Sequence, residues 1–446
     1  MFKRSLTSNL KSWSELKNRK PLVIRGARQT GKTTLVNDFA SGFEQYIYLN
    51  LEKPEDRKFF ELELSFQEMI ATLFFTKGKI LKRKKTLIFI DEIQNSSKAV
   101  NLLRYFYEEA PDLYVIAAGS LVESLMDKSI SFPVGRIEFM VIRPVSFYEF
   151  LAAMNEVQSL ELIQQIPFPE FGHEKVLKLF NLYSLLGGMP GILNEYIDTR
   201  DLTLVSRIYS SLIISYMDDV EKYGKNPSMT SIIRFIIQNA FLYAGSRIKF
   251  QGFGKSSYRS REMGEAFRSL EQSMFLQLIY PSTSVKRPAL PDNKKSPRLQ
   301  LLDTGLVNFF AGVQESLIEA KEIDEVFEGK IAEHLTGQEL LSLQTTPLYR
   351  LNFWTREEAY AQAEVDFVWN FRNYLIPIEV KSGPTGKMRS LHQFIDRSSH
   401  PFAVRIYSGK LKIEETKTIA GKQFKLLSLP FYLIGKINNY LEYFFE

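Results

Sequence analysis

The residues best suited to chemistry lie near the start of the chain, in a glycine-rich segment that ends in a lysine and two threonines. Residues 26–33 read GARQTGKT and match the pattern G-x-x-x-x-G-K-[ST] at every fixed position. Glycines at these places let successive backbone N–H groups point inward at phosphate oxygens, and a helix N-terminus adds partial positive charge. Lys32 can reach the β- and γ-phosphates, and the Thr33 hydroxyl can ligate Mg²⁺. The segment therefore predicts a binding site for a nucleoside triphosphate with magnesium.

Two adjacent carboxylates, Asp91 and Glu92, form a second set of candidate residues. They follow residues 86–90, an apolar run of the kind that forms a buried strand. Ligands of parallel sheets bind at the carboxyl ends of the strands, which is where these two side chains would stand. Asp91 is expected to hold Mg²⁺ through water, and Glu92 is expected to polarise the attacking water. The alternative is an exposed acidic strand end, which is common in α/β proteins.

Five apolar runs predict the strands that would position these side chains. They lie at residues 22–24, 46–50, 86–90, 112–118 and 137–142. A helix is expected at residues 34–40, directly after the glycine-rich segment, and other helices would cross between the strands. Strands joined by helical crossovers form a doubly wound parallel sheet, so the fold class is α/β. We expect this first domain to span residues 1–155.

Composition sets broad limits on the class of protein. At 446 residues the chain is long enough for about two to four domains, and its apolar content of 45% is ordinary for a globular protein. The absence of cysteine excludes disulfides and thiolate metal sites. No segment has the unbroken apolar length of a membrane span, and residues 1–13 lack the apolar core of a signal peptide. We expect a cytoplasmic protein with no membrane partner, and the net charge of +6 is weak support for nucleic acid.

Several segments resemble a prokaryotic family of AAA-type P-loop ATPases of the additional-strand class. They are GARQTGKT, LIFIDEIQ, AAGS, FPVGR and RPVSFYEFL in the first domain, LLGGMPGIL at residues 185–193 and SPRLQLLDTGL at residues 296–306. The resemblance therefore runs over nearly the whole chain. It implies a sheet with strand order 5-1-4-3-2, ATP and Mg²⁺ as ligands, and hydrolysis of ATP. It also implies a C-terminal domain of unknown function with a nuclease-like fold.

The resemblance assigns roles residue by residue. Asp91 would bind the metal with Thr33, Glu92 would activate water, and Ser120 would sense the γ-phosphate, although serine is also a common turn residue. Arg136 corresponds to a family arginine that could act as a finger in cis or in trans, or could form a surface salt bridge. A finger in trans would require a homo-oligomer. The residues expected to bind phosphate are Gly26, Ala27, Arg28, Gln29, Thr30, Gly31, Lys32, Thr33 and Thr34.

The middle of the chain divides into a helical part and a basic part. Residues 156–240 have helical apolar spacing and are expected to form a helical lid on the ATPase core. Asp218 and Asp219 near its end are interpreted as exposed helix carboxylates and not as a metal site.

Residues 241–300 are expected to form a winged-helix-like module that contacts DNA. A helix at residues 257–272, an extended segment at 276–280 and a loop rich in proline and lysine support this interpretation. Phosphate contacts from such a module would be salt-sensitive and have little sequence specificity. The alternative is a solvated basic surface. The basic residues are Arg247, Lys249, Lys255, Arg259, Arg261, Arg268, Lys286, Arg287, Lys294, Lys295 and Arg298.

A second group of charged residues lies in the last domain, expected at residues 301–446. Residues 364–381 read as two strands around a turn near residues 372 and 373. A hairpin that is symmetric about this turn opposes Asp366 to Glu379 and Glu364 to Lys381, and alternation puts these four side chains on one face. The other, apolar face would carry Val365, Phe367, Trp369, Ile376, Ile378 and Val380. We expect a charged front and a buried back.

The spacing of these residues resembles the PD-(D/E)xK nuclease core, a restriction-endonuclease-like α/β fold. Asp366, Glu379 and Lys381 match its pattern, and Glu333, on a helix expected at residues 325–343, would be its acidic helix residue. Two opposed carboxylates repel unless a cation or proton joins them, so Mg²⁺ or Mn²⁺ is expected between them.

In that arrangement Lys381 would act on the attacking water or on the developing phosphoryl charge. The proline of the pattern is missing, because Val365 stands before Asp366. The alternative is a cross-strand ion pair between Glu364 and Lys381 with solvated neighbours.

Two functions are consistent with these residues. The first is an ATP-hydrolysing, DNA-associated protein with a metal-dependent nuclease-like domain. The second is a nucleotide-switched regulator or scaffold whose nuclease-like domain binds and does not cut.

Overall fold

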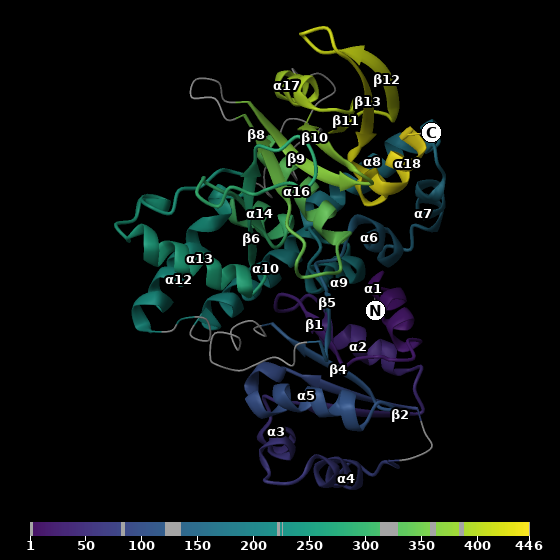
Figure 1. Cartoon of the computed structure of the whole chain (residues 1–446), viewed down its shortest axis with the longest axis vertical. Helices are drawn as coiled ribbons and strands as arrows, with labels where there is room; N and C mark the ends of the chain where they lie inside the picture. The colour runs from purple at the N-terminus through teal and green to yellow at the C-terminus, as the bar shows by residue number, and fades with distance from the viewer. Residues whose placement is uncertain are drawn as a thin grey trace.

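The computed structural model describes residues 3–81, 85–120, 135–220, 224, 226–312, 329–356, 363–382 and 388–445. An N-terminal sheet with its helices, a helical middle and a C-terminal sheet follow one another along the long axis of the molecule (Figure 1). Residues 132–134 of the FPVGR segment and the first residues of the helix expected at 325–343 lie outside the described residues. Within the described residues, no helix has the length and apolarity that crossing a membrane requires.

The N-terminal sheet has five parallel strands in the order β2-β3-β4-β1-β5. Read from the other edge, this is 5-1-4-3-2, so the predicted order is confirmed. β1 and β3 are buried along their whole length, as expected for strands covered on both faces. The strands are β1 (Leu22–Arg25), β2 (Gln45–Asn50), β3 (Thr86–Asp91), β4 (Tyr114–Gly119) and β5 (Glu138–Val141).

Helices cover both faces of this sheet. Leu22 and Ile24 of β1 belong to a buried cluster with α1 and α2, whereas Val23 points the other way, into a cluster with α3, α4 and α5. The helices are α1 (Leu6–Ser14), α2 (Lys32–Ala40), α3 (Pro54–Glu61), α4 (Phe66–Thr76) and α5 (Ser97–Glu109).

Figure 1 shows part of the helical middle between the two sheets, and other helices of it beside the C-terminal sheet. Its first helix begins with a capping box, in which Ser146 and Glu149 exchange hydrogen bonds with each other's backbone N–H groups. Gly187 and Gly188 separate the third and fourth helices. The helices are α6 (Phe147–Ala153), α7 (Val157–Gln164), α8 (His173–Leu186), α9 (Pro190–Thr199), α10 (Leu202–Asp218), α12 (Pro227–Ala240) and α13 (Ser260–Gln272).

The C-terminal sheet has eight strands in the order β12-β13-β11-β10-β9-β8-β6-β7. β6 and β7, the strands of this sheet that come first in the sequence, follow α13 and form an antiparallel pair. β6 also pairs in parallel with β8. The extended segment expected at residues 276–280 is therefore part of the C-terminal sheet, which crosses the boundary predicted at residue 300. The strands are β6 (Leu276–Ser282), β7 (Arg298–Leu301), β8 (Asn352–Thr355), β9 (Glu364–Phe371), β10 (Tyr374–Lys381), β11 (Phe402–Tyr407), β12 (Lys412–Lys417) and β13 (Gln423–Pro430).

Helices also pack on both faces of the C-terminal sheet. α16 and α18 belong to the large cluster on one face, and α17 belongs to a smaller cluster on the other. The helices are α14 (Thr304–Phe310), α16 (Gly329–Ser342), α17 (Arg389–Arg397) and α18 (Ile437–Phe445).

The hairpin of β9 and β10 has the predicted symmetric register, from the pair Phe371–Tyr374 to the pair Phe367–Ile378. A bulge against β8 shifts the start of β9, so Val365 packs with Trp354 in the smaller cluster and not with Phe367. The prediction that Val365 shares the apolar back of the hairpin is therefore wrong. The face of the hairpin that is expected to be charged has its charged residues at the strand ends. The rest of that face packs against α17.

Candidate functional site

The glycine-rich segment forms the turn between β1 and α2, and its backbone takes left-handed conformations. Gly31 has a φ of 93° and Gln29 a φ of 62°. A Cβ atom at Gly26 would lie 2.5 Å from the Ile142 side chain, so only glycine fits there. Because α2 begins at Lys32, its first N–H groups face the turn. Residues 26–34 therefore have the form of an anion-binding turn at a helix N-terminus.

The Lys32 ammonium group is held inside this turn. Its Nζ donates hydrogen bonds to the carbonyl oxygens of Gly26 and Ala27, each at 2.9 Å. Burial lowers the pKa of Lys32 to about 8, because the charged form loses water. A phosphate group would supply a charged acceptor, which makes stronger hydrogen bonds than a carbonyl does.

Thr33 and Asp91 meet at the carboxyl edge of the sheet. The Thr33 hydroxyl donates to Asp91 Oδ2 at 2.7 Å, and the Tyr48 hydroxyl donates to the same oxygen at 3.2 Å. Hydroxyl and carboxylate oxygens are the ligands that Mg²⁺ prefers, so these two residues fit the ion expected with a nucleotide. The sequence predicted both residues, and the fold places them in contact.

Glu92 stands next to this pair in a left-handed conformation, with a φ of 52°. Such a conformation is uncommon for a residue other than glycine and is found at functional sites. Its carboxylate accepts a hydrogen bond from the Gln94 side chain, and burial raises its pKa. A carboxylate with a raised pKa is a better base toward water than an exposed one.

Ser120 and Arg136 have different surroundings. Ser120 follows β4 and is half-buried, at the same edge of the sheet as the glycine-rich turn. Arg136 lies on the surface, where it forms an ion pair with Glu108 of α5 at 2.8 Å. Within one chain, Arg136 therefore forms a surface salt bridge, which is the alternative to a role as an arginine finger.

The end of α10 contacts the glycine-rich turn. Asp219, which caps this helix, is buried and forms an ion pair with the Arg28 side chain. The Tyr216 hydroxyl donates to the Arg28 carbonyl oxygen at 2.8 Å. The interpretation of Asp219 as an exposed carboxylate is therefore wrong, whereas Asp218 is exposed. No pattern in the sequence signals this contact, because Arg28 and Asp219 are 191 positions apart.

A pocket of about 380 Å³ adjoins the start of α2. The Arg4 side chain, from the N-terminal segment, donates to the Thr30 carbonyl oxygen at 3.0 Å and to the Arg143 carbonyl oxygen at 2.6 Å. The pocket is thus lined by the N-terminal segment, the glycine-rich turn with the start of α2, and α9. Its lining residues are Arg4, Gly31, Thr34, Leu35, Asp38, Pro190 and Asn194.

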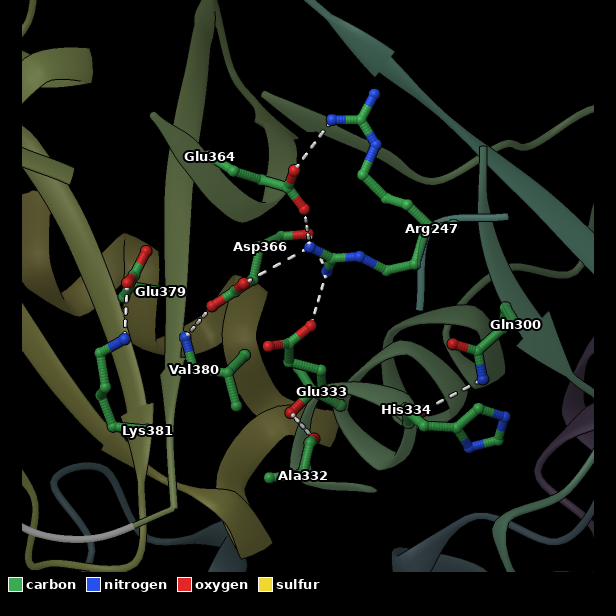
Figure 2. A network of polar contacts seen from close by, with 12 residues as sticks. Arg247, Gln300, Ala332, Glu333, His334, Glu364, Asp366, Glu379, Val380 and Lys381 are labelled. Carbon is green, nitrogen blue, oxygen red and sulfur yellow. Dashed lines mark hydrogen bonds and ion pairs between the residues drawn. The ribbon is translucent and has the colours of Figure 1, made fainter. Parts of the chain in front are cut away.

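The acidic residues of the C-terminal domain gather around a buried arginine, Arg298 of β7. Figure 2 shows the carboxylates of Glu333, Glu364 and Asp366 directed toward one guanidinium group. Arg298 Nη1 lies 3.0 Å from Glu333 Oε2, and Nη2 lies 3.6 Å from Asp366 Oδ1 and contacts Glu364 Oε1. We call these three acids, with Glu379, the acidic centre.

Lys381 takes a partner other than the one considered from the sequence. Its Nζ lies 2.7 Å from Glu379 Oε1 on the same strand, and Glu364 pairs with Arg298 and Arg247 (Figure 2). The alternative ion pair between Glu364 and Lys381 is therefore wrong. Asp366 and Glu379 do lie at adjacent strand ends, as predicted, and Glu333 joins them from α16.

Electrostatics in the acidic centre reflect its burial. Loss of water raises the pKa of Glu333 and of Glu379 to about 8, with the Asp366 charge as the next cause, and burial also raises the pKa of Asp366. Burial alone would lower the pKa of Arg298, but the charges of Glu333 and its neighbours outweigh burial and raise it.

The acidic centre does not fit a divalent ion while Arg298 occupies it. Asp366 Oδ2 accepts from the Val380 N–H at 2.8 Å, and Asp366 Oδ1 and Glu333 face the guanidinium. In the described part of the chain, no three His, Cys, Asp or Glu side chains are grouped to hold a metal. The sequence alone places Arg298 among DNA-contacting residues, and its burial contradicts that interpretation. The signal that could have found it is the position of Arg298 at the start of a buried strand, because a buried charge needs a buried partner.

Part of the predicted basic surface remains exposed. Lys255, Arg259, Arg261 and Arg268 lie on α13 or just before it and are exposed, and we call them the α13 basic cluster. Arg261 also forms an ion pair with Glu265 at 3.3 Å.

Three family descriptions match successive parts of the chain. Residues 18–151 match an AAA domain, residues 177–317 match a domain of unknown function (DUF8612), and residues 328–432 match another domain of unknown function (DUF4143). The first match and the site geometry agree, so the N-terminal domain is an AAA-type P-loop ATPase domain. A relative from Haemophilus influenzae, described as an uncharacterized protein, is 25% identical over 229 residues. That alignment covers 49% of this chain and 51% of the relative, so the chain spans about half the length of the curated relative it matches.

Three solved structures align with part of this chain, each at a TM-score below 0.5. A Walker-type ATPase of Pyrococcus abyssi has a TM-score of 0.45 and 16% identity, and covers 70% of this chain and 96% of its own. The Orc1 protein of Aeropyrum pernix in complex with DNA has a TM-score of 0.27 and 16% identity, with coverages of 70% and 91%. The Holliday junction branch migration motor RuvB of Thermotoga maritima has a TM-score of 0.27 and 16% identity, with coverages of 66% and 93%.

Proposed function

We propose that the protein is an ATP-hydrolysing, DNA-associated ATPase whose nucleotide site controls its C-terminal domain. The observation that carries the proposal is the contact between Thr33 and Asp91 beside the buried Lys32. It brings a phosphate-binding turn, a Mg²⁺-binding pair and a carboxylate base, Glu92, to one edge of the sheet.

In this proposal each side chain has a separate task. The backbone N–H groups of residues 26–34 and the Lys32 ammonium bind the phosphates, and Thr33 and Asp91 would hold Mg²⁺, which neutralises phosphate charge when bound. Glu92 accepts a proton from the attacking water or orients it. Ser120 and Arg136 are proposed to sense the γ-phosphate and to stabilise transition-state charge; for Arg136 this requires release from Glu108, for example in a homo-oligomer.

Control of the C-terminal domain would pass through buried contacts between the domains. The Gly188 N–H donates to Asp303 Oδ2 at 2.5 Å, and the Val145 N–H donates to the Gly188 carbonyl oxygen at 2.7 Å. A Cβ atom at Gly187 would lie 2.3 Å from Asp303 Oδ1, so the approach is too close for any other residue. The segment between α8 and α9 is therefore held against the start of α14. Pro190, which follows this segment, lines the pocket beside the start of α2.

A second contact joins the end of the AAA domain to α16. Glu339 accepts from the Phe147 N–H at 3.1 Å and from the Tyr183 hydroxyl at 2.7 Å. Gln338, its neighbour, donates to Asp303 at 3.4 Å. The same helix carries Glu333 of the acidic centre, so a shift of α8 against α16 would reach that centre.

The α13 basic cluster supports association with DNA. Its four cationic side chains are exposed and lie on α13 or just before it. Such residues would contact phosphates, which carry no sequence information, and not bases. The winged-helix-like and nuclease-like descriptions of residues 241–300 and 301–446 remain part of this proposal.

For the C-terminal domain, the geometry favours binding over cutting. Cleavage in the manner of the PD-(D/E)xK core would need Mg²⁺ or Mn²⁺ on Asp366 and Glu379, with Glu333 in support. Arg298 faces two of these three carboxylates, and Lys381 is paired with the third. We therefore propose the nucleotide-switched scaffold as the function of this domain, with metal-dependent cleavage as the competing candidate.

ATP turnover tests the proposal. Purified protein should release phosphate from ATP in the presence of Mg²⁺. Glu92→Gln keeps the side-chain shape and loses the base, so it should bind ATP with an affinity close to that of the wild type and show at least about 100-fold slower hydrolysis. Lys32→Ala should lose tight ATP binding, because phosphate charge is left uncompensated. Equal hydrolysis by Glu92→Gln and the wild type would remove Glu92 from its role.

A further inference from the structure

The guanidinium group of Arg298 stands where a cation shared by the acidic centre would have to be. Its two terminal nitrogens face Glu333, Glu364 and Asp366, at 3.0 Å from the first and 3.6 Å from the last. Nη1 also donates to the Asp366 carbonyl oxygen at 3.1 Å. One side chain from β7 therefore contacts acids from α16 and β9.

Several contacts fix Arg298 in this place. Its side chain is only 5% exposed, and its guanidinium lies 5.0 Å from the centre of the Phe353 ring and 5.9 Å from that of Phe367. Its backbone pairs with Ile279 of β6 and with Arg247. An arginine held at both its backbone and its side chain is part of the folded core and not a surface residue that can swing away.

The carboxylate oxygens of the acidic centre are largely engaged. Asp366 Oδ2 accepts from the Val380 N–H at 2.8 Å, and Glu379 Oε1 is paired with Lys381 at 2.7 Å. Within the described residues, Glu379 Oε2 is a buried oxygen with no hydrogen-bond partner. An open oxygen beside a lysine and an arginine is a poor ligand for a dication, because both neighbours repel the ion.

We propose that Arg298 replaces the divalent cation in the acidic centre, so that this nuclease-like centre is held together by a protein cation and binds no Mg²⁺ or Mn²⁺. The inference deepens the proposed scaffold function and rests on it, because a centre closed to metal would bind without cutting. Arg247 and Lys381 add two further positive charges, through Glu364 and Glu379.

Manganese binding to nucleotide-free protein tests the inference. Titration calorimetry and the electron paramagnetic resonance of free Mn²⁺ should give the same number of sites and the same affinity for the wild type and for Asp366→Asn. Arg298→Gln removes the positive charge while keeping a polar side chain, and it should gain one Mn²⁺ site that the wild type does not have. The double variant Arg298→Gln with Asp366→Asn should not have that site.

Two results would overturn the inference. One is a Mn²⁺ site in the wild type that Asp366→Asn removes. The other is a folded Arg298→Gln variant that gains no site. If Arg298→Gln does not fold, the comparison of the wild type with Asp366→Asn decides alone. ATP hydrolysis by the same wild-type preparation separates the two proposals, since its absence would contradict the ATPase function and leave the metal result unaffected.

Discussion

The buried carboxylate of Glu339 should make the stability of the contact between the AAA domain and α16 depend on pH. Burial raises its pKa from 4.5 to about 7, and the hydrogen bonds from Tyr183 and Phe147 offset only part of this effect. In the unfolded chain the group releases its proton near its ordinary pKa. Between these two values the folded protein binds more protons, so its free energy of unfolding should fall as pH rises. The loss should be complete above about pH 8.

The size of this loss follows from the two pKa values. Their difference, at about 1.4 kcal/mol for each pH unit, corresponds to about 3 kcal/mol. Glu339→Gln removes the charge and keeps an oxygen that can accept from the Phe147 N–H. The free energy of unfolding of Glu339→Gln, minus that of the wild type, should therefore rise by about 3 kcal/mol between pH 4.5 and pH 8.

Urea denaturation followed by tryptophan fluorescence at several pH values measures this difference, because Trp354 and Trp369 are buried in the C-terminal sheet. Glu339→Ala is the matched control. It removes both hydrogen-bond acceptors and should be destabilised by about 1–3 kcal/mol even at low pH. If the wild type and Glu339→Gln show the same dependence on pH, Glu339 is not held as a buried carboxylate and the reasoning is refuted.

Two further predictions concern DNA and the segment between α8 and α9. Reversing the charges of Lys255, Arg259 and Arg261 should flatten the dependence of DNA affinity on salt concentration, by up to about 0.9 in logarithmic slope for each phosphate that is no longer neutralised, as measured by fluorescence anisotropy. A slope that the triple variant leaves unchanged would place DNA binding elsewhere. Gly188→Ala should cost about 1–3 kcal/mol in urea denaturation, because its Cβ would lie 2.2 Å from the Val145 carbonyl oxygen. Gly191→Ala, whose Cβ would meet its nearest neighbour at 3.8 Å, is the control and should cost little.

The geometry of the glycine-rich turn could be predicted from the sequence because its parts are local. The glycines, Lys32 and Thr33 are fixed by spacing within one turn, and Asp91 follows an apolar strand whose end is easy to locate. The register of β9 and β10 could be predicted for the same reason, since a tight turn at Arg372, with a φ of 48°, sets all later pairs.

The partners of buried charges could not be predicted, because they come from distant parts of the chain. Arg298 and Glu364 are 66 positions apart, and Arg298 lies in a basic segment whose other members are mostly exposed. The bulge that moves Val365 to the opposite face depends on pairing with β8. Composition cannot reveal either feature, since both depend on which strands become neighbours.

The central claim is that nucleotide binding reaches the C-terminal domain through the segment between α8 and α9. Hydrogen exchange of the Glu92→Gln variant, with and without ATP and Mg²⁺, tests it directly, because this variant should hold ATP without turning it over. We predict that ATP changes the protection of residues 183–190 and of α16 as well as that of the phosphate-binding turn. Changes confined to residues 18–151, with α16 unaffected at saturating ATP, would contradict the claim.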